Sequence, residues 1–358
     1  MAKIDGLFKL MKQQGASDLH ISSGSPPILR QHGEMEKLNY PPLTNDQAKM
    51  LLFEILNEEQ RAQFENTHDL DFAYEIPGLA RFRGNILETY RGIAGVFRII
   101  PSKILSADEL NLPPGIRKLC NLKKGLVLVT GPTGSGKSTT LAAMVDLINA
   151  TRREHILTLE DPLEFIHENK MSLMNQRQIG QHTLSFAAAL KGALREDPDV
   201  TLVGEMRDLE TISLAMTAAE TGHLVYGTLH TNSAPKTIDR IIDAFPKDAQ
   251  EQVRTMLGES LKGVICQQLM KTADGKGRIA AHEILIGNAA VANLIREGKT
   301  FRIPSIMQTA KGEGMQLMDQ RILELLKEQK ITPEEAHRCA VDKRSFEQYL
   351  PKQDGNKP

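Results

Sequence analysis

A glycine-rich turn between an apolar run and a helix-forming stretch constrains this chain most. Residues 125–140 have the sequence GLVLVTGPTGSGKSTT, in which Gly131, Gly136, Lys137 and Ser138 fit the pattern GxxxxGK[ST]. Glycines let backbone N–H groups converge on a phosphate, and the start of the following helix adds partial positive charge. The pattern predicts a nucleotide-phosphate loop in which Lys137 reaches the β- and γ-phosphates and Ser138 holds Mg²⁺. The expected binding residues are Gly131, Pro132, Thr133, Gly134, Ser135, Gly136, Lys137, Ser138 and Thr139.

Composition sets the class of protein and its compartment. The 358 residues are 41% apolar, enough for two or more domains with real cores. Lys and Arg number 44 against 45 Asp and Glu, so the net charge gives no global attraction to nucleic acid or anionic lipid. Apolar runs are far shorter than the roughly 20 residues of a membrane span, and the N-terminus has no signal-peptide core. We expect a cytoplasmic globular protein.

Cysteine and histidine spacing argues against a metal site. Cys120, Cys266 and Cys339 lie far apart, which favours reduced thiols over a zinc knuckle or a disulfide framework. His223 and His230 are seven residues apart, and on one regular strand they would face opposite sides. A metal shared by these two histidines is therefore not expected.

The first hundred residues predict a mixed α+β domain. Apolar spacing favours a short amphipathic helix that Gly15 ends, followed by a strand at 17–22. Thr44 to Gln47 form a capping-box start for a helix through Leu56. Alternation predicts a half-buried strand over 69–76, and 80–88 and 92–100 continue as antiparallel strands. We place the domain at 1–100, and prolines 101, 113 and 114 predict a linker at 101–112.

Beyond the linker, continuous apolar runs alternate with helical patterns, as in a buried parallel sheet flanked by helices. The runs are 125–130, 155–160, 199–204, 223–229 and 278–286. Helices are expected at 233–245 and 247–270. The predicted core spans 113–287, an all-helical region spans 288–350, and the polar segment 351–358 is expected to be disordered.

Carboxylates at two predicted strand ends are candidates for catalytic residues near the bound phosphate. Glu205 ends an apolar strand, although Gly204 stands where an aspartate is usual. A carboxylate there faces the phosphate loop, because ligands bind at the carboxyl edge of parallel sheets. Glu160, Asp161 and Glu164 form a second acidic cluster. Either Glu160 or Glu164 is a candidate to position the attacking water, and the pattern alone does not choose between them.

Two arginines flank a core position in the first domain. Arg81 and Arg83 share one face of a strand while Phe82 points to the core. Paired guanidinium groups suit a phosphate or an acidic partner, although a solvated strand face is the simpler interpretation of the pair alone.

Four segments together resemble the type II secretion and type IV pilus ATPases. They are GPTGSGKSTT, LTLEDPLEF, REDPDVTLVGEMRDLETI and GHLVYGTLHTNSA, which resemble that family's Walker A, Asp box, atypical Walker B and His box. The segment GASDLHISSGSPPILRQHGEM resembles its N-terminal signature. The resemblance implies an α/β fold with an N-terminal PAS-like α+β domain, a RecA-like P-loop ATPase domain and a helical C-terminal region. It also implies a homohexamer with ATP and Mg²⁺ at a domain junction.

The same resemblance implies roles for individual residues. Glu164 is the first candidate for the catalytic glutamate and Glu160 the second, while Glu205 acts through the magnesium shell. His223 and His230 match the His-box sensors of nucleotide state. The arginines offered to nucleotide across a subunit boundary are Arg81, Arg83 and Arg98.

Within the family, the chain is most similar to the pilus retraction motors. This implies a cytoplasmic hexamer docked on an inner-membrane platform protein and the pilus base, with peripheral membrane association and no stable nucleic-acid partner. One departure is Ala292: residues 290–297 are AVANLIRE where those motors have AIRNLIRE. The role of the missing arginine is therefore not carried over.

Other functions remain open at this stage. A pilus extension ATPase would share the core, but usually has a longer N-terminal region and a four-cysteine zinc insertion. An accessory retraction ATPase would depend on a principal motor. A RecA-like nucleic-acid translocase is disfavoured because the chain has no Trp and 4% aromatic residues, which leaves few stacking platforms. A nucleotide-binding scaffold without turnover would not need the carboxylates.

Overall fold

The computed structural model describes residues 2–31, 33–100 and 103–351. Its contacts divide the chain into two units, residues 1–103 with 162–166 and residues 104–161 with 167–358. Each unit has its own hydrophobic core. Residues 101 and 102, at the start of the predicted linker, lie outside the described part, and the predicted domain boundaries stay predictions.

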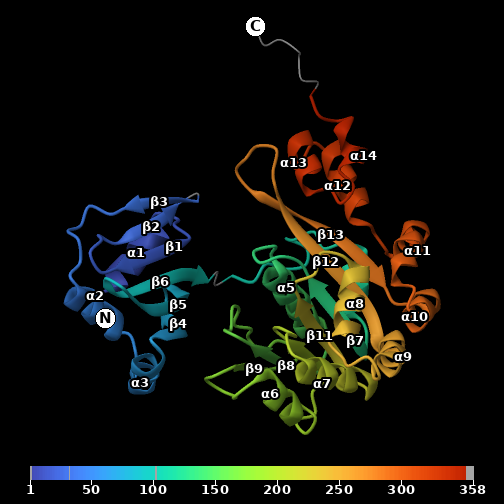
Figure 1. The fold of residues 1–358 in the computed structure, drawn as a ribbon, viewed down its shortest axis with the longest axis horizontal. Coiled ribbons are helices and arrows are strands. Elements are labelled where there is room, and N and C mark those ends of the chain that lie inside the picture. Colours follow the sequence, from blue (N-terminus) through green and yellow to red (C-terminus); the bar gives the residue numbers. More distant parts are fainter. Residues whose placement is uncertain (1, 32, 101–102, 352–358) are drawn as a thin grey trace. The chain divides into compact units, whose positions relative to one another are not determined.

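The first unit is built on an antiparallel sheet of six strands in the order β3-β2-β1-β6-β5-β4 (Figure 1). Its elements are α1 (Asp5–Gln13), β1 (Asp18–Ser22), β2 (Ile28–Gln31), β3 (Glu34–Lys37), α2 (Asn45–Phe53), α3 (Glu58–Thr67), β4 (Asp69–Ile76), β5 (Ala80–Thr89) and β6 (Gly92–Ile100).

The core of this unit joins α1 to the sheet. Phe8 of α1 is fully buried and stacks on Phe82 of β5, with ring centroids 4.3 Å apart. The predicted first helix, the strand at 17–22 and the three strands from 69 to 100 are confirmed. The capping box at Thr44 is confirmed too, but its helix ends at Phe53 rather than Leu56. Helix α3, capped by Asn57, was not predicted.

The second unit contains a sheet of seven strands in the order β13-β12-β7-β11-β10-β8-β9. The strands are β7 (Gly125–Thr130), β8 (His155–Glu160), β9 (Leu173–Gln178), β10 (Val200–Val203), β11 (Leu224–Leu229), β12 (Leu261–Lys271) and β13 (Arg278–Ile286). The flanking helices are α4 (Pro114–Cys120), α5 (Lys137–Thr151), α6 (Phe186–Ala193), α7 (Leu209–Glu220), α8 (Ala234–Asp243) and α9 (Gln250–Ser260).

Most of this sheet is parallel, as the continuous apolar runs predict. Strand β13 is the exception, because it pairs antiparallel with β12 along a hairpin. Residues 278–286 form a strand of this sheet, as predicted, but the prediction that this strand is parallel to its neighbour is wrong. A buried apolar run marks a strand inside a sheet, but it does not fix the direction of that strand.

The predicted helix at 247–270 is half wrong. Helix α9 ends at Ser260, and the chain continues directly into β12. Val253, Leu257, Leu261 and Val264 keep a helical spacing, which explains the prediction. The sheet overrides this periodicity because Val264, Ile265 and Cys266 are all fully buried, which requires burial on both faces.

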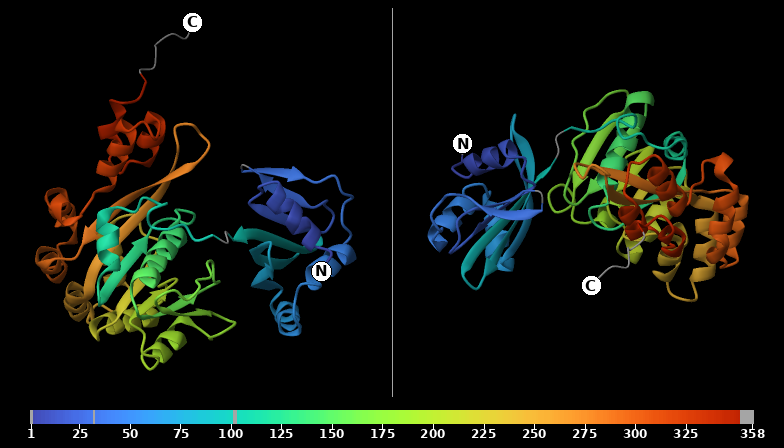
Figure 2. Two further views of the ribbon diagram at one scale, coloured as in Figure 1. Left: turned by 180° about the vertical axis from the view of Figure 1, so that it is seen from behind. Right: turned by 90° about the horizontal axis from the view of Figure 1, so that it is seen from above.

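Helices follow the sheet to the C-terminus. They are α10 (Ala289–Arg296), η1 (Thr300–Arg302), α11 (Ile303–Thr309), η2 (Lys311–Glu313), α12 (Met318–Lys327), α13 (Pro333–Cys339) and α14 (Arg344–Glu347). The hairpin of β12 and β13 extends to α12 and α13, where Met270 and Ala281 join a separate small core (Figures 1 and 2). The predicted disordered tail falls almost entirely on residues 352–358, outside the described part.

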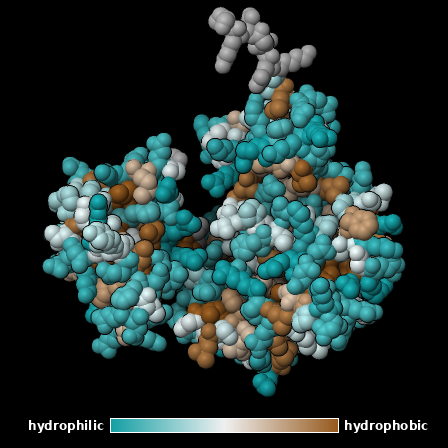
Figure 3. Space-filling view, viewed as in Figure 1, coloured by the Kyte–Doolittle hydropathy of each residue, from teal (hydrophilic) through white to brown (hydrophobic). Residues whose placement is uncertain are grey.

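Polar residues cover most of the surface of each unit in the view of Figure 3, with apolar residues among them singly and in small groups. Over the described residues, no helix has the length and apolar character needed to cross a bilayer.

Candidate nucleotide site

The phosphate loop lies between β7 and α5, in the order that the sequence predicts. Gly131, Gly134 and Gly136 have φ angles of 146°, 78° and 86°. Residues other than glycine rarely adopt this backbone conformation. These angles turn the chain sharply between the buried strand and the helix. The loop is therefore shaped by its glycines, as the motif requires.

The start of α5 fits an anion. Gly136 precedes the helix without a side-chain cap, and the first turn carries no acidic residue. The first N–H groups of a helix lack intrahelical partners, so they are donors for a phosphate. Lys137 donates from Nζ to the carbonyl oxygens of Gly131 at 2.8 Å and Pro132 at 3.1 Å, which keeps its ammonium group over the loop.

The other loop residues divide by burial. Pro132, Thr133 and Gly134 are exposed, while Ser138 and Thr139 are half-buried at the helix start. Ser135 is buried, and its Oγ has no hydrogen-bond partner within the described residues.

Glu205 lies at the same edge of the sheet as the loop. Strand β10 runs parallel to β11, which runs parallel to β7, so the residues after β10 and β7 lie at one carboxyl edge. Oε1 of Glu205 is 2.9 Å from Nε2 of His230 and also accepts a hydrogen bond from Arg207. Burial opposes ionisation of Glu205, but Arg207 and then His230 outweigh it and lower the pKa of this carboxyl. Glu205 is an anion at neutral pH.

The structure explains why a glycine precedes this glutamate. A Cβ atom at Gly204 would lie 3.0 Å from the carbonyl oxygen of Leu159 and 3.2 Å from Cα of Glu160. An aspartate side chain there would be crowded by the backbone of the neighbouring strand β8, which would have to shift by a few tenths of an ångström. This crowding favours glycine at residue 204, and the carboxylate stands at the next residue, Glu205.

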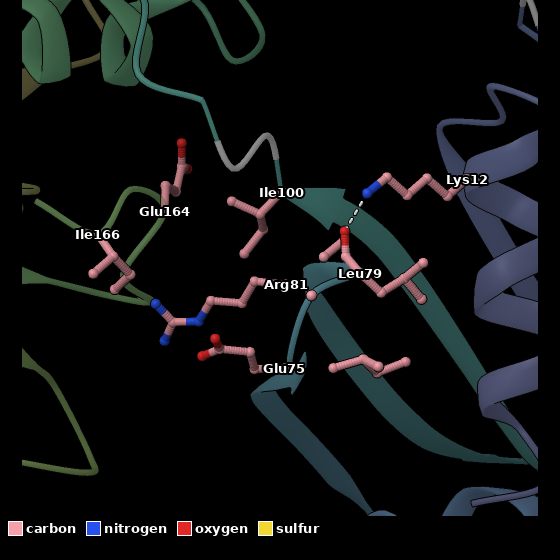
Figure 4. A pocket seen from close by; sticks show the side chains of 10 residues that line it. Lys12, Glu75, Leu79, Arg81, Ile100, Glu164 and Ile166 are labelled. Carbon is pink, nitrogen blue, oxygen red and sulfur yellow. Dashed lines mark hydrogen bonds between the residues drawn. The ribbon is translucent and has the colours of Figure 1, made fainter. Parts of the chain in front are cut away.

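The second acidic cluster does not lie in one unit. Glu160 ends β8, where Oε1 accepts a 2.7 Å hydrogen bond from Oγ1 of Thr158. Glu164 belongs to the first unit, with residues 162–166. There it lines a pocket of about 330 Å³ together with Glu75, Arg81 and Ile166. Figure 4 shows the Arg81 side chain beside Glu75 in this pocket.

His223 and His230 lie at opposite ends of strand β11, in the second sheet. His230 directly follows β11, beside the end of β7, whereas His223 precedes β11. A strand of this length separates them by about 20 Å. Nδ1 of His223 lies 3.0 Å from the carbonyl oxygen of Ala218 at the end of α7. The structure therefore brings His230, but not His223, to Glu205.

The predicted arginines lie in the first unit. Phe82 is fully buried as predicted, Arg81 is half-buried, and Arg83 is exposed. Arg83 is paired in register with Arg98 on β6, which places the two side chains on one face of the sheet. Nε of Arg98 is 2.7 Å from the buried carboxylate of Asp18, while the Arg98 side chain remains 69% exposed.

Sequence reasoning missed two residues of this site. Arg207 contacts Glu205, and its position two residues after that glutamate was a signal that the local sequence contained. Gln267 contacts the phosphate loop from β12, and it was hidden by the wrong helix prediction. Within the described residues, no group of three or more His, Cys, Asp or Glu side chains is placed to hold a metal, and the three cysteines are buried and free.

A glycine-shaped loop, an uncapped helix start and an ionised carboxylate at the same sheet edge define a P-loop ATPase. The chain belongs to the type II/IV secretion system protein family, whose model matches residues 4–338.

Two relatives and one solved structure are similar over most of the chain. The "Twitching motility protein" of Neisseria gonorrhoeae is 55% identical over 320 residues, covering 89% of this chain and 86% of that protein. The "Type IV pilus retractation ATPase PilT" of Pseudomonas aeruginosa is 52% identical over 343 residues, covering 96% and 99%. A crystal structure of the pilus retraction motor PilT with bound ADP has a TM-score of 0.89 and 45% identity, and covers 97% of this chain and 99% of that one.

Proposed function

We propose that this chain is an ATPase motor that couples ATP hydrolysis to retraction of the type IV pilus. The observation that carries the proposal is a complete phosphate loop beside Glu205, in a chain 52% identical over 96% of its length to a pilus retraction ATPase. The motor works as a cytoplasmic homohexamer docked on the inner-membrane platform protein and the pilus base. Its contact with the membrane is peripheral.

The proposed chemistry uses groups at the carboxyl edge of the second sheet. Lys137 and the first N–H groups of α5 bind the β- and γ-phosphates of ATP. Ser138 and Glu205 would hold Mg²⁺, which would neutralise charge that develops on the phosphates. His230 contacts Glu205 directly, so a change at the γ-phosphate reaches the chain after β11 through this pair.

Glu164 remains the first candidate for the residue that orients the attacking water, and Glu160 the second. The hydrogen bond from Thr158 fixes Glu160, and it supports a structural role for that side chain. Glu164 lies in the irregular segment after β8 and shares a pocket with Arg81, and no hydrogen bond to its side chain is seen among the described residues.

We also propose that Arg83 and Arg98, which share one face of the first sheet, act on nucleotide held by a neighbouring subunit. Arg81, on the same strand as Arg83, is the third candidate for this role. An arginine supplied from another chain is worth about 10³ to 10⁵ in rate in related phosphoryl transfers. The Arg83 side chain is exposed, which supports this role because an exposed guanidinium can contact a second copy of the chain. His223, at the far edge of the second sheet, is a candidate sensor through α7 rather than through nucleotide.

Extension and accessory retraction motors are the nearest alternative functions. The identity to retraction ATPases supports the retraction assignment, and the near-neutral charge speaks against a nucleic-acid translocase. Ala292 lies half-buried on α10, which packs on α9, and no role in coupling is assigned to this position.

The test counts surface pili on cells that lack this protein and on cells that carry only the Lys137→Ala form. Excess pili that no longer retract in both strains are the expected result, because Lys137 is needed to bind the phosphate. Cells without surface pili would instead show that the motor drives pilus extension. An unchanged number of pili would show that it has an accessory role. Expression of the wild-type chain from a plasmid is the control, and it should restore normal pilus numbers.

A further inference from the structure

A buried glutamine on β12 braces the phosphate loop. Gln267 is 2% exposed and lies on the strand next to β7. Its side-chain Nε2 donates to the carbonyl oxygen of Ser135 at 2.7 Å, and its Oε1 accepts from Oγ1 of Thr140 at 2.7 Å. One side chain thereby holds both the end of the loop and the first turn of α5.

The contact between β12 and the loop is close. A Cβ atom on Gly131 would collide with the backbone oxygen of Gln267, and one on Gly136 would lie 2.9 Å from Nε2 of Gln267. The two loop glycines therefore leave space for this residue as well as for a phosphate. Such an approach leaves the loop little freedom to shift relative to β12.

The hydrogen bond to Ser135 fixes the orientation of a peptide group. In a trans peptide the carbonyl of one residue and the N–H of the next point in opposite directions. Because the Ser135 carbonyl points at Gln267, the N–H of Gly136 points away from β12. Loss of the bond would leave a buried carbonyl without a partner, which is unfavourable and favours rotation of this peptide.

We propose that Gln267 is a positioning residue for nucleotide binding, which keeps the Gly136 N–H directed at the phosphates and the first turn of α5 in place beneath them. The inference rests on the proposed binding of phosphate in residues 131–139. Gln267 does not touch the nucleotide itself; it acts through the backbone of the loop. The amide is suited to this work because it donates to Ser135 and accepts from Thr140 at once.

The main variant is Gln267→Leu, which keeps the approximate volume and removes both hydrogen bonds. We expect the KM for ATP and the Kd for a fluorescent ADP analogue to rise about 10-fold to 100-fold, because small shifts of binding groups have effects of this order. The kcat should change less than about threefold. A purely structural role would instead lower the melting temperature of the nucleotide-free protein and leave KM unchanged.

The matched control is Gln268→Leu, the same substitution one residue further along β12. Gln268 is half-buried on the opposite face of the strand, and its side chain makes no hydrogen bond to the described residues. Its KM should equal that of the wild type. An equal rise in KM in both variants would contradict the proposal.

Thr140 provides a second route if Gln267→Leu fails to fold. Thr140→Val removes the hydroxyl that Gln267 accepts from, whereas Thr140→Ser keeps it. We expect a raised KM for the valine variant and rescue by serine. Unchanged KM in a folded Gln267→Leu or Thr140→Val variant would overturn the inference.

Lys137→Ala separates this inference from the proposed function. If that variant binds the ADP analogue as well as the wild type does, phosphate does not bind in the loop and both proposals fail. If Lys137→Ala loses affinity while Gln267→Leu does not, the loop is the site and only the role of Gln267 is wrong.

Discussion

The carboxylate of Glu205 shows how neighbours decide the charge of one side chain. Burial alone would raise the pKa of this group, but the contacts with Arg207 and His230 lower it. An ionised carboxylate next to a phosphate loop repels the nucleotide unless a cation lies between them. The proposed role of Glu205 as a magnesium ligand depends on this negative charge.

Glu205→Gln should separate binding from turnover. The amide cannot supply the negative charge that holds magnesium, so we expect ATP hydrolysis to fall by about 100-fold or more, as when other charge-stabilising groups are removed. Affinity for ADP without magnesium should stay within about threefold of the wild type. Steady-state hydrolysis and ADP titration measure the two quantities. Glu210→Gln, an exposed partner of Lys191, is the control and should be fully active; normal hydrolysis by Glu205→Gln would remove this residue from the mechanism.

His282 should make stability depend on pH. Burial, and then the charge of Arg321, lower the pKa of His282 to about 4, from an ordinary value of 6.5. Between these values the unfolded chain binds a proton that the folded chain does not. The free energy of unfolding should therefore fall as the pH drops from 6.5 to 4, by up to about 3 kcal/mol from this residue.

The measurement is urea unfolding of the wild type and of His282→Asn at several pH values. His167, whose pKa burial also lowers to about 4, contributes the same trend in both proteins. The slope with pH should be smaller in the variant, whatever its absolute stability. Parallel slopes would show that His282 is already protonated in the folded chain or still neutral in the unfolded one.

At the scale of single elements, local signals were reliable where one segment contains all of the information. The capping box at Thr44 consists of two reciprocal hydrogen bonds, Gln47 N–H to Oγ1 of Thr44 at 3.2 Å and Thr44 N–H to Oε1 of Gln47 at 2.9 Å. Both partners lie within four residues. The sequence could therefore predict the start of α2, but not its end, which has no comparable signal.

Thr44→Ala should lower the stability of the first unit. Removal of an N-cap side chain costs about 1 kcal/mol, which lowers the melting temperature of a domain of this size by about 4 to 8 °C. Thr44→Ser keeps the hydroxyl oxygen and should melt within about 2 °C of the wild type. Calorimetry compares the three proteins. Equal melting temperatures for all three would mean that the cap is replaced by water.

Strand β12 shows where local signals fail. Its apolar residues continue the helical spacing of α9, and only the neighbours supplied by β7 and β13 make it a strand. Gln267 was missed for the same reason, because a glutamine inside a predicted helix gives no hint of a phosphate loop more than a hundred residues earlier. The loop and Glu205 were predictable because each follows a recognisable apolar strand. The division of the acidic cluster between two units was not.

At the scale of the whole molecule, the candidate site residues are divided between the two units. Lys137, Ser138 and Glu205 lie in one, and Arg83 and Arg98 lie in the other. A site completed by a second copy of the chain predicts complementation between two inactive variants. A site completed within one chain predicts none.

Mixing Arg83→Ala with Lys137→Ala tests this directly. In a randomly mixed ring, about one quarter of the subunit boundaries join an intact loop to an intact arginine, so hydrolysis should recover to roughly that fraction of the wild-type rate. The two variants alone set the baseline. A mixture of wild type with the double variant controls for dilution. No recovery in rings shown to be mixed would place Arg83 in its own chain's site, or outside the mechanism.

The brace from Gln267 to Ser135 joins residues 132 positions apart. A ribosome adds about 5 to 20 residues each second, so the loop waits about 7 to 26 s for its support after it has been made. During this interval the nascent chain carries the full phosphate-binding motif without the strand that shapes it. If Gln267 positions the loop as proposed, we expect the chain to reach its full affinity for nucleotide only after β12 has been made, when most of the second unit already exists.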